Sequence, residues 1–402
     1  MNKNTRYALI ILYFIFLFPI ILTFILGGTT SSVIVTGSFS IRNYGEIIAI
    51  AIAIFYIITN ANFFYDRCLN NKYLKPFFYL SFVYIISTIW SDFKLLTFFR
   101  SIEFYVSSVL SLLIYNEFCT IDNKFNNKGL RRFLYHIITI GILNGLFKRI
   151  AFNNLLIQQN LLADNALSII LAGSFLICFY QKFFLKDNNK MFYFLFFALI
   201  FISYSLTAFV TLAVSIFYLY LARSNSNKKN LFIISILITV TVYFFIGQIS
   251  IVSELLSYVS FRDLEKIESL TGRENIWRLT IDELDGRILG SGFATDMHLL
   301  MGRFMNNQIG EVSSGHNVFL ESYIAAKWLG VTLVVYSFYF WYKKAKICFS
   351  KEHANLVESL ILLALISGFT VSGYGGSLVS HPHILFWVIF TPLIVSSNNE
   401  QK

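Results

Sequence analysis

The sequence predicts an all-α, polytopic membrane protein with about twelve transmembrane helices and one large outer loop. Hydrophobic residues make up 56% of its 402 residues and charged residues only 13%, whereas soluble domains carry roughly a quarter charged residues. Apolar runs recur along the whole chain, many of them near the roughly 20 residues that cross a bilayer as a helix. The formal charge of +10 does not indicate a nucleic-acid partner, because Lys and Arg lie mostly in short segments between apolar runs, as in cytoplasmic loops.

The predicted spans begin close to the amino terminus. The run from Ala8 to Leu26 is long for a signal peptide, and no convincing small-x-small cleavage site follows it. The stretch 191–222 is divided near Ser203–Ser205, because one helix of that length would overshoot the membrane. The predicted spans cover residues 8–26, 46–64, 76–91, 95–115, 133–149, 164–181, 191–205, 206–222, 231–248, 328–343, 356–374 and 383–397.

Basic clusters give the predicted orientation. With the amino terminus inside the cell, every second connection carries its Lys and Arg on the same side, as the positive-inside rule requires. Both termini are then cytoplasmic, and an odd number of spans before the last cluster would break the alternation. The clusters comprise Arg67, Lys72 and Lys75; Lys124, Lys128, Arg131 and Arg132; Lys182, Lys186 and Lys190; Arg223, Lys228 and Lys229; and Lys343, Lys344, Lys346 and Lys351.

One outer connection is far longer than the others. It divides the chain into spans one to nine (residues 1–247), a polar outer loop (248–317) and the last three spans (318–402). The loop holds six basic and ten acidic residues, and most of these charges are expected to form a solvated face or local helix pairs. The run from Asn275 to Leu284 has helical periodicity, which predicts ordered structure within the loop.

Three short pieces of this region carry residues suited to chemistry. They are Thr271–Trp277 (TGRENIW), a Gly-Arg turn before an amphipathic helix; Leu289–Phe293 (LGSGF), a Gly-x-Gly bend; and Ser314–Glu321 (SGHNVFLE), a His-Asn pair at the re-entry to the membrane. Arginine binds phosphate through a bidentate fork. A histidine with a pKa near neutral transfers protons or donates to an anionic leaving group.

In this order and spacing, the three pieces resemble the C-terminal region of the O-antigen ligase and polymerase superfamily, bacterial membrane glycosyltransferases that use lipid-linked glycans. Asn160–Ala163 (NLLA), which opens a span, is similar to the family's Asn-x-x-Ala element. One feature departs from the family. Many relatives carry a Ser-Arg pair at the outer start of a span, where this chain reads Leu206–Phe209 (LTAF) without an Arg. The resemblance assigns that arginine to holding the lipid pyrophosphate. In this chain the role is therefore either absent or moved to Lys148 and Arg149, which lie on the outer side against the positive-inside trend.

The resemblance implies a metal-independent, cofactor-free glycosyltransferase in the bacterial inner membrane, with its active site in the periplasmic loop. Its expected substrate is an undecaprenyl-pyrophosphate-linked glycan, and its expected partners are membrane lipid, a chain-length regulator and a flippase. The absence of the Ser-Arg pair favours a polymerase over a ligase, which would transfer the glycan to lipid A–core. The predicted catalytic residues are His316 and Arg273, and the predicted substrate-binding residues are Lys148, Arg149, Arg303, Asn317 and Trp277.

Other interpretations stay open at this point. A lipid-linked oligosaccharide transporter also has about twelve spans, although no two similar halves are visible in the sequence, and a membrane-embedded structural subunit is a third class. Arg100 and Glu103, three residues apart within one predicted span, are expected to pair on one helix face. Lys327 is expected to snorkel near the outer end of its span. His381 and His383 lack an acidic neighbour and do not predict a metal site.

Overall fold

The computed structural model describes nine continuous ranges of the chain together with residue 65 and scattered positions between 7 and 25. All regular elements within these ranges are helices, and the ranges contain no strand, so the all-α prediction is confirmed for this part of the chain. The ranges are residues 41–61, 75–119, 128–151, 165–186, 191–202, 206–224, 273–295, 317–348 and 351–369.

The helices follow the predicted spans closely, because long Leu-, Ile- and Phe-rich runs form helices that bury one face against their neighbours. The predicted spans 231–248 and 383–397, and the predicted division at residues 203–205, lie outside the described residues. The helices are α2 (Ile41–Thr59), α4 (Lys75–Ile86) with the short 3-10 helix η3 (Ser87–Ile89), α5 (Lys94–Cys119), α6 (Lys128–Ala151), α7 (Asn165–Phe183), α8 (Met191–Ile202), α9 (Leu206–Ser224), α13 (Arg273–Glu283), α16 (Val318–Cys348) and α17 (Lys351–Gly368).

Two of these elements bear directly on the sequence predictions. Helix α13 confirms the helix expected from the periodicity of residues 275–284. Within the described ranges, Val318–Lys346 of α16 is the helix long and apolar enough to cross a membrane. Other helices are apolar but shorter over the residues described, such as Ser168–Phe183 and Ala208–Ala222. The described part of the chain is therefore all-helical, with one helix that is both long and apolar enough to cross a membrane.

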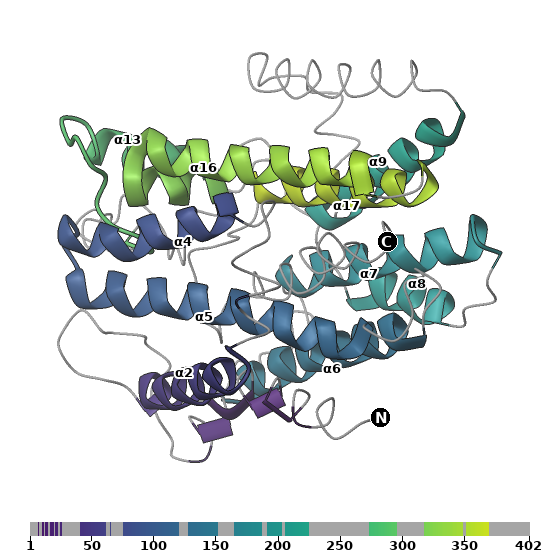
Figure 1. The fold of residues 1–402 in the computed structure, drawn as a ribbon, viewed down its shortest axis with the longest axis horizontal. Coiled ribbons are helices and arrows are strands. Elements are labelled where there is room, and N and C mark those ends of the chain that lie inside the picture. The colour runs from purple at the N-terminus through teal and green to yellow at the C-terminus, as the bar shows by residue number, and fades with distance from the viewer. Residues whose placement is uncertain are drawn as a thin grey trace.

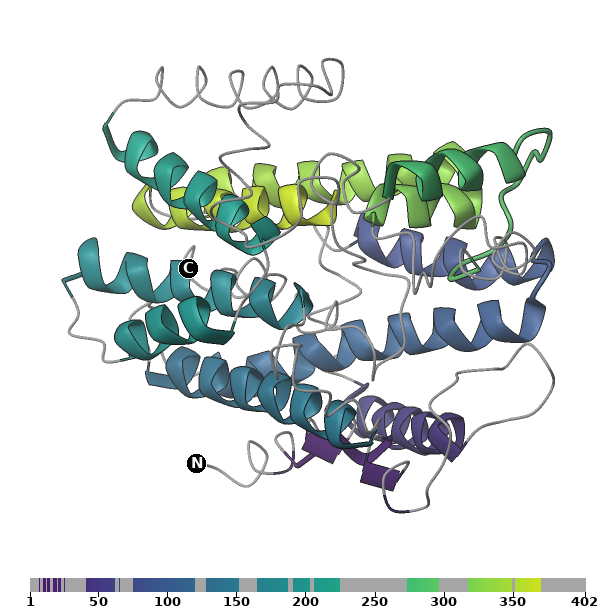
Figure 2. The same cartoon turned by 180° about the vertical axis from the view of Figure 1, so that it is seen from behind.

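The long helices lie roughly side by side along the long axis of the molecule (Figure 1). Neighbours in sequence form antiparallel hairpins, as in α4–α5 and α16–α17, while α16 also packs on α4 and α17 on α9. Helix α13, the turn between α4 and α5, and the first turns of α16 gather at one end of the array, on the left in Figure 1 and on the right in Figure 2. The α7–α8 and α16–α17 connections lie at the opposite end.

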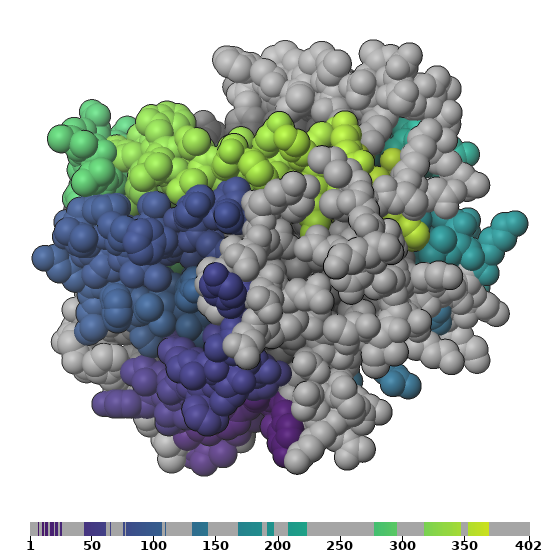
Figure 3. All heavy atoms as spheres, viewed as in Figure 1, coloured from purple at the N-terminus to yellow at the C-terminus, as the bar shows by residue number. Residues whose placement is uncertain are grey.

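The helices are apolar on both their inner and outer faces. Aromatic side chains such as Tyr84, Phe104 and Trp341 are almost fully buried between helices. Large apolar side chains are also exposed on the same helices, including Phe82 on α4 and Tyr339 on α16. Figure 3 shows one face of the packed surface formed over α4, α5 and α16. A helix that is hydrophobic all round belongs in the core of a large protein or in a membrane.

A buried ionic cluster joins α2 to α5. Arg100 donates to Glu103 at 2.6 Å and to Glu46 at 3.1 Å, and all three residues are at most 6% exposed. The pairing of Arg100 with Glu103 that the sequence predicted is confirmed, and Glu46 is a third member from another helix. A buried cation is tolerated only with such compensation, because removing it from water has a large free-energy cost.

Candidate functional site

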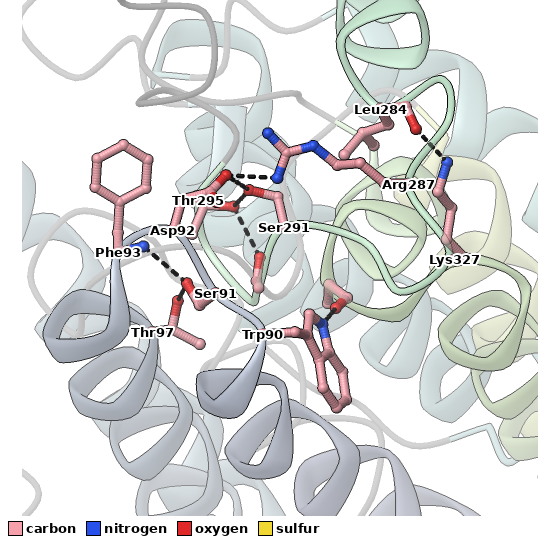
Figure 4. Close-up of polar contacts among 12 residues, drawn as sticks. Trp90, Ser91, Asp92, Phe93, Thr97, Leu284, Arg287, Ser291, Thr295 and Lys327 are labelled. Atoms are coloured by element: carbon pink, nitrogen blue, oxygen red, sulfur yellow. Dashed lines mark hydrogen bonds and ion pairs between the residues drawn. The ribbon is translucent and has the colours of Figure 1, made fainter.

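The candidate site is built around residues 284–295, which follow α13 and are called the docking loop. This loop runs from the end of α13 to the turn between η3 and α5, and it contacts the first half of α16 on the way (Figure 4). It contains the Gly-x-Gly bend identified in the sequence. It thereby connects two of the three predicted pieces, α13 and the start of α16, to the α4–α5 hairpin.

Helix α13 packs on α16 through a small apolar cluster. Leu284, at the end of α13, is buried against Leu320 and Ile324 of α16. Trp277 and Tyr323 cover this cluster from the two helices. The spacing of Trp277 and Leu284, seven residues apart on one helix face, explains why this side of α13 is apolar while its other side is charged.

The glycines of the bend allow the loop backbone to approach its neighbours closely. Gly290 has φ +37, and a Cβ at this position would lie 2.2 Å from the carbonyl oxygen of Ile324. Gly292 has φ +105, and a Cβ there would lie 2.4 Å from Oγ of Ser91. Both positions require glycine for conformation and for space. The Gly-x-Gly sequence is thus explained by the docking of the loop.

An aromatic side chain anchors the end of the docking loop. Phe293 is fully buried and stacks on Tyr84 with ring centroids 4.0 Å apart, and Phe104 lies at 5.6 Å. The Phe293 N–H donates to Oγ of Ser87 at 3.1 Å. Stacked aromatic pairs stabilise beyond the area that they bury, so Phe293 is the main apolar attachment of the loop to the α4–α5 hairpin.

Polar contacts surround this anchor on its more accessible side. Arg287 Nη1 donates to Oδ2 of Asp92 at 2.5 Å, and the Ser291 hydroxyl donates to the same oxygen at 3.3 Å. Thr295 Oγ1 donates to the Gly292 carbonyl at 2.8 Å and lies 3.2 Å from Ser291 Oγ. About 40% of each charged side chain of the Asp92–Arg287 pair stays exposed, and such accessible pairs contribute little to stability. Figure 4 shows the guanidinium pointing toward Asp92 across the loop.

Helix α16 is broken where the docking loop meets it. Ala326 (φ −151, ψ 30) and Lys327 (φ 51, ψ −141) have non-helical conformations. The carbonyls of Ile324 and Ala325 would accept the N–H groups four residues later in a straight helix. Here the Ser291 N–H donates to Ile324 at 2.7 Å, and the Trp90 indole N–H donates to Ala325 at 3.0 Å. The break is therefore satisfied by neighbouring elements rather than by the helix itself.

Lys327 turns its ammonium into the site. Its Nζ donates to the Leu284 carbonyl at 2.7 Å and lies over the ring of Tyr323, 4.8 Å from the centroid. The ammonium therefore contacts the end of α13; the sequence predicted only that it would snorkel near the outer end of its span. The cation thereby connects the broken part of α16 with the carboxyl end of α13 (Figure 4).

Two of the predicted substrate-binding side chains are described. Trp277 is half-buried in the apolar cluster between α13 and α16. Asn317 is 8% exposed, and its Oδ1 accepts the N–H groups of Phe319 and Leu320 at 2.9 and 3.1 Å. Asn317 is thus the N-cap of α16. Its side-chain oxygen therefore stabilises the first turn of α16.

For the other predicted site residues, the structure gives at most the position of the backbone. Arg273 is the first residue of α13, and Lys148 and Arg149 lie in the last turn of α6, but their side chains lie outside the described part of the structure. Arg303 and His316 lie outside the described residues altogether. His316 immediately precedes Asn317, so its backbone joins the amino end of α16.

The sequence did not identify Trp90 or Asp92 as part of a site. Trp90 lies at the end of the predicted span 76–91 and Asp92 in the turn that follows it, where a Trp and a charged residue are expected at any membrane boundary. Their roles become visible only when residues about 200 positions later, Arg287 and Ala325, are brought beside them.

A comparison with models of known protein families found no match to the chain, and a comparison with curated protein sequences found none either. The functional assignment therefore depends on the sequence motifs and on the geometry described above.

Proposed function

We propose that this chain is a polytopic membrane glycosyltransferase that joins undecaprenyl-pyrophosphate-linked repeat units at the periplasmic face of the bacterial inner membrane. One observation carries the proposal. The helix that follows the Gly-Arg turn and the Gly-x-Gly bend both contact the first turns of α16, which begins 25 residues after the bend. The contacts are the Trp277–Leu320 cluster and the Ser291–Ile324 hydrogen bond. The motifs whose order gave the family resemblance thus lie close together in space.

The surface of the helical array supports a membrane location. Single exposed apolar residues are common on soluble proteins, but contiguous apolar faces are not. Here exposed aromatic and aliphatic side chains recur along α2, α4, α8, α9 and α16. The carboxyl ends of α7 and α16, which carry Lys182 and the Lys343–Lys346 cluster, lie at one end of the array, and the docking loop lies at the other (Figure 1). This separation is the one that the positive-inside rule predicts for a multi-pass protein.

The expected chemistry uses the amino ends of two helices that pack together. Arg273 begins α13, and His316 precedes the N-cap of α16. The amino end of a helix favours anions. In the proposed reaction the acceptor hydroxyl oxygen attacks the anomeric carbon, and the bond from that carbon to the pyrophosphate oxygen breaks. Arg273 neutralises the charge that develops on the departing pyrophosphate, and His316 accepts the proton of the hydroxyl.

A second candidate is a lipid-linked oligosaccharide transporter, because broken helices such as α16 occur at the substrate sites of transporters. The location of the break favours the transferase instead. It lies only nine residues after the start of α16, and its freed carbonyls are taken up by Ser291 and Trp90. The break in α16 is therefore the point at which the docking loop attaches to this helix.

The test is a gel of lipopolysaccharide from a strain that lacks the gene. A polymerase predicts lipid A–core with a single repeat unit, since ligation still works. Core without any repeat, with long chains on undecaprenyl pyrophosphate, would assign the protein as the ligase. Repeat units retained on the cytoplasmic leaflet would assign it as the transporter, and an unchanged ladder would exclude all three.

Complementation with variants then tests the residues. Arg273→Ala and His316→Ala are expected to leave only the single-repeat product. Arg278→Ala is the matched control, because Arg278 is an exposed arginine on the same helix. Restoration of the full ladder by His316→Ala would show that this histidine is not the proton acceptor.

A further inference from the structure

Lys327 occupies a backbone conformation that a lysine rarely adopts. Its φ of +51 and ψ of −141 place it in a region suited to glycine, inside the longest of the described helices. Strained residues of this kind persist only when surrounding contacts hold them, and they cluster at functional sites. A lysine at this position is therefore expected to make a specific contact that a glycine could not make.

The side chain of Lys327 makes such a contact. Its Nζ donates to the carbonyl of Leu284, the residue that follows the last turn of α13. That carbonyl also accepts the Arg287 N–H at 3.1 Å, which closes the turn after the helix. A cation at the carboxyl end of a helix is favourable, because the last carbonyls carry partial negative charge. Within the described residues, no carboxylate forms an ion pair with Lys327.

The opposite end of α13 carries Arg273. An 11-residue helix is a rigid rod, about 16 Å long at 1.5 Å per residue. If its carboxyl end is released, α13 can tilt about the contact at Trp277, which lies four residues from Arg273. Over that distance of about 6 Å, a tilt of about 10° displaces the amino end by roughly 1 Å. A misplacement of even ~1 Å at a reacting group lowers rates by about 100-fold. Whatever holds the carboxyl end therefore controls where Arg273 lies.

We infer that Lys327 is a positioning residue: its ammonium clamps the carboxyl end of α13 and thereby fixes the amino end of this helix, where Arg273 would contact the pyrophosphate group of the lipid-linked donor. This inference rests on the proposed function for the role of Arg273. The clamp itself rests only on the geometry of α13 and the α16 break. Trp277 then serves as the apolar contact about which α13 would otherwise turn.

The experiment compares Lys327→Met, Lys327→Arg and Lys327→Gly in the full-length protein, purified in lipid nanodiscs. Transfer is measured with undecaprenyl-pyrophosphate-linked repeat units, and hydrogen exchange is measured for the amides of residues 277–287. Lys327→Met is expected to raise the donor KM at least about 10-fold and to lower kcat/KM by about 100-fold, with faster exchange at the end of α13. Lys327→Arg restores both, because it retains a cation.

Lys327→Gly separates the clamp from simple stability. Glycine relieves the backbone strain but lacks the ammonium, so we expect the same kinetic defect as in Lys327→Met. Lys186→Met is the matched control, because Lys186 is an exposed lysine with a similar φ of +56 in the α7–α8 connection. It should leave the donor KM and the exchange of residues 277–287 unchanged.

The outcomes distinguish the two proposals. An inactive wild-type protein with lipid-linked donors would overturn the proposed function, and the exchange data would still decide whether Lys327 holds α13. An active wild type with unchanged donor KM and unchanged exchange in Lys327→Met would overturn the role of Lys327 alone. A loss of total activity at constant KM would also overturn it, because that pattern means fewer folded molecules rather than a displaced arginine.

Discussion

Substitution of Gly290 by alanine should release the docking loop from α16. The added Cβ would lie 2.2 Å from the Ile324 carbonyl oxygen and 2.9 Å from backbone atoms of Ala325. Because these are backbone atoms, no side-chain rotation relieves the contact. The loop must move away, and the Ser291 N–H then loses its hydrogen bond to Ile324.

Gly286 allows the effect of this contact to be isolated. It too has a positive φ, +75, but a Cβ there would meet nothing within 4 Å. Alanine at either glycine carries the conformational penalty of about 1–2 kcal/mol for a left-handed residue. Only Gly290→Ala adds the overpacking term of about 1–3 kcal/mol. The difference between the two variants therefore corresponds to a shift of about 5- to 150-fold in the equilibrium between docked and released loop.

The assay is hydrogen exchange of residues 284–295 in the full-length protein in nanodiscs, read against exchange of α7 as an internal reference. Gly290→Ala should accelerate exchange of the Ser291 and Phe293 amides far more than Gly286→Ala does, with α7 unaffected. Equal acceleration in the two variants would refute the reasoning, because the close approach to Ile324 would then contribute nothing beyond the backbone conformation.

Two further substitutions test the interior. Arg100→Gln should lower stability by about 3–5 kcal/mol, because it leaves Glu46 and Glu103 buried without their cation; the measurement is the unfolding temperature in detergent. Phe293→Ala should lower stability by about 3–5 kcal/mol through the lost stacking on Tyr84 and the cavity left behind, and it should also make the docking loop sensitive to protease.

Both have controls in the same chain. Arg132→Gln removes an exposed arginine from α6, and Phe98→Ala truncates a phenylalanine of α5 that is 49% exposed. Each is expected to change stability far less than its buried counterpart. An Arg100→Gln protein as stable as Arg132→Gln would mean that the carboxylates of α2 and α5 do not depend on this guanidinium.

The helices could be predicted because their signal is local. Apolar runs of suitable length, separated by basic segments, gave most of the described helices, and the periodicity of residues 275–284 gave α13. The ion pair of Arg100 with Glu103 followed from their i, i+3 spacing. Its third member, Glu46, could not be predicted, because 54 residues separate it from Arg100 and the pairing depends on how α2 packs against α5.

The break in α16 could not be predicted for a different reason. Neither Ala326 nor Lys327 is a helix breaker, and the surrounding sequence has good helix formers. The break is stabilised from outside the helix, by the Trp90 indole and the Ser291 N–H. The candidate site likewise depends on contacts between distant segments. The short motifs indicate its parts, but only the packing of the α4–α5 turn against the docking loop brings these parts together.

That packing also constrains the proposed topology. Asp92 and Arg287 form an ion pair, so in the proposed topology both would lie on the same side of the membrane, separated by an even number of spans. The sequence predicts six spans between these residues: five correspond to α5, α6, α7, α8 and α9, and the sixth is 231–248. Had 191–222 been a single span, the number would be five, and Arg287 would lie on the cytoplasmic side, away from Asp92. The ion pair therefore supports the division of that stretch into α8 and α9 independently of the basic clusters.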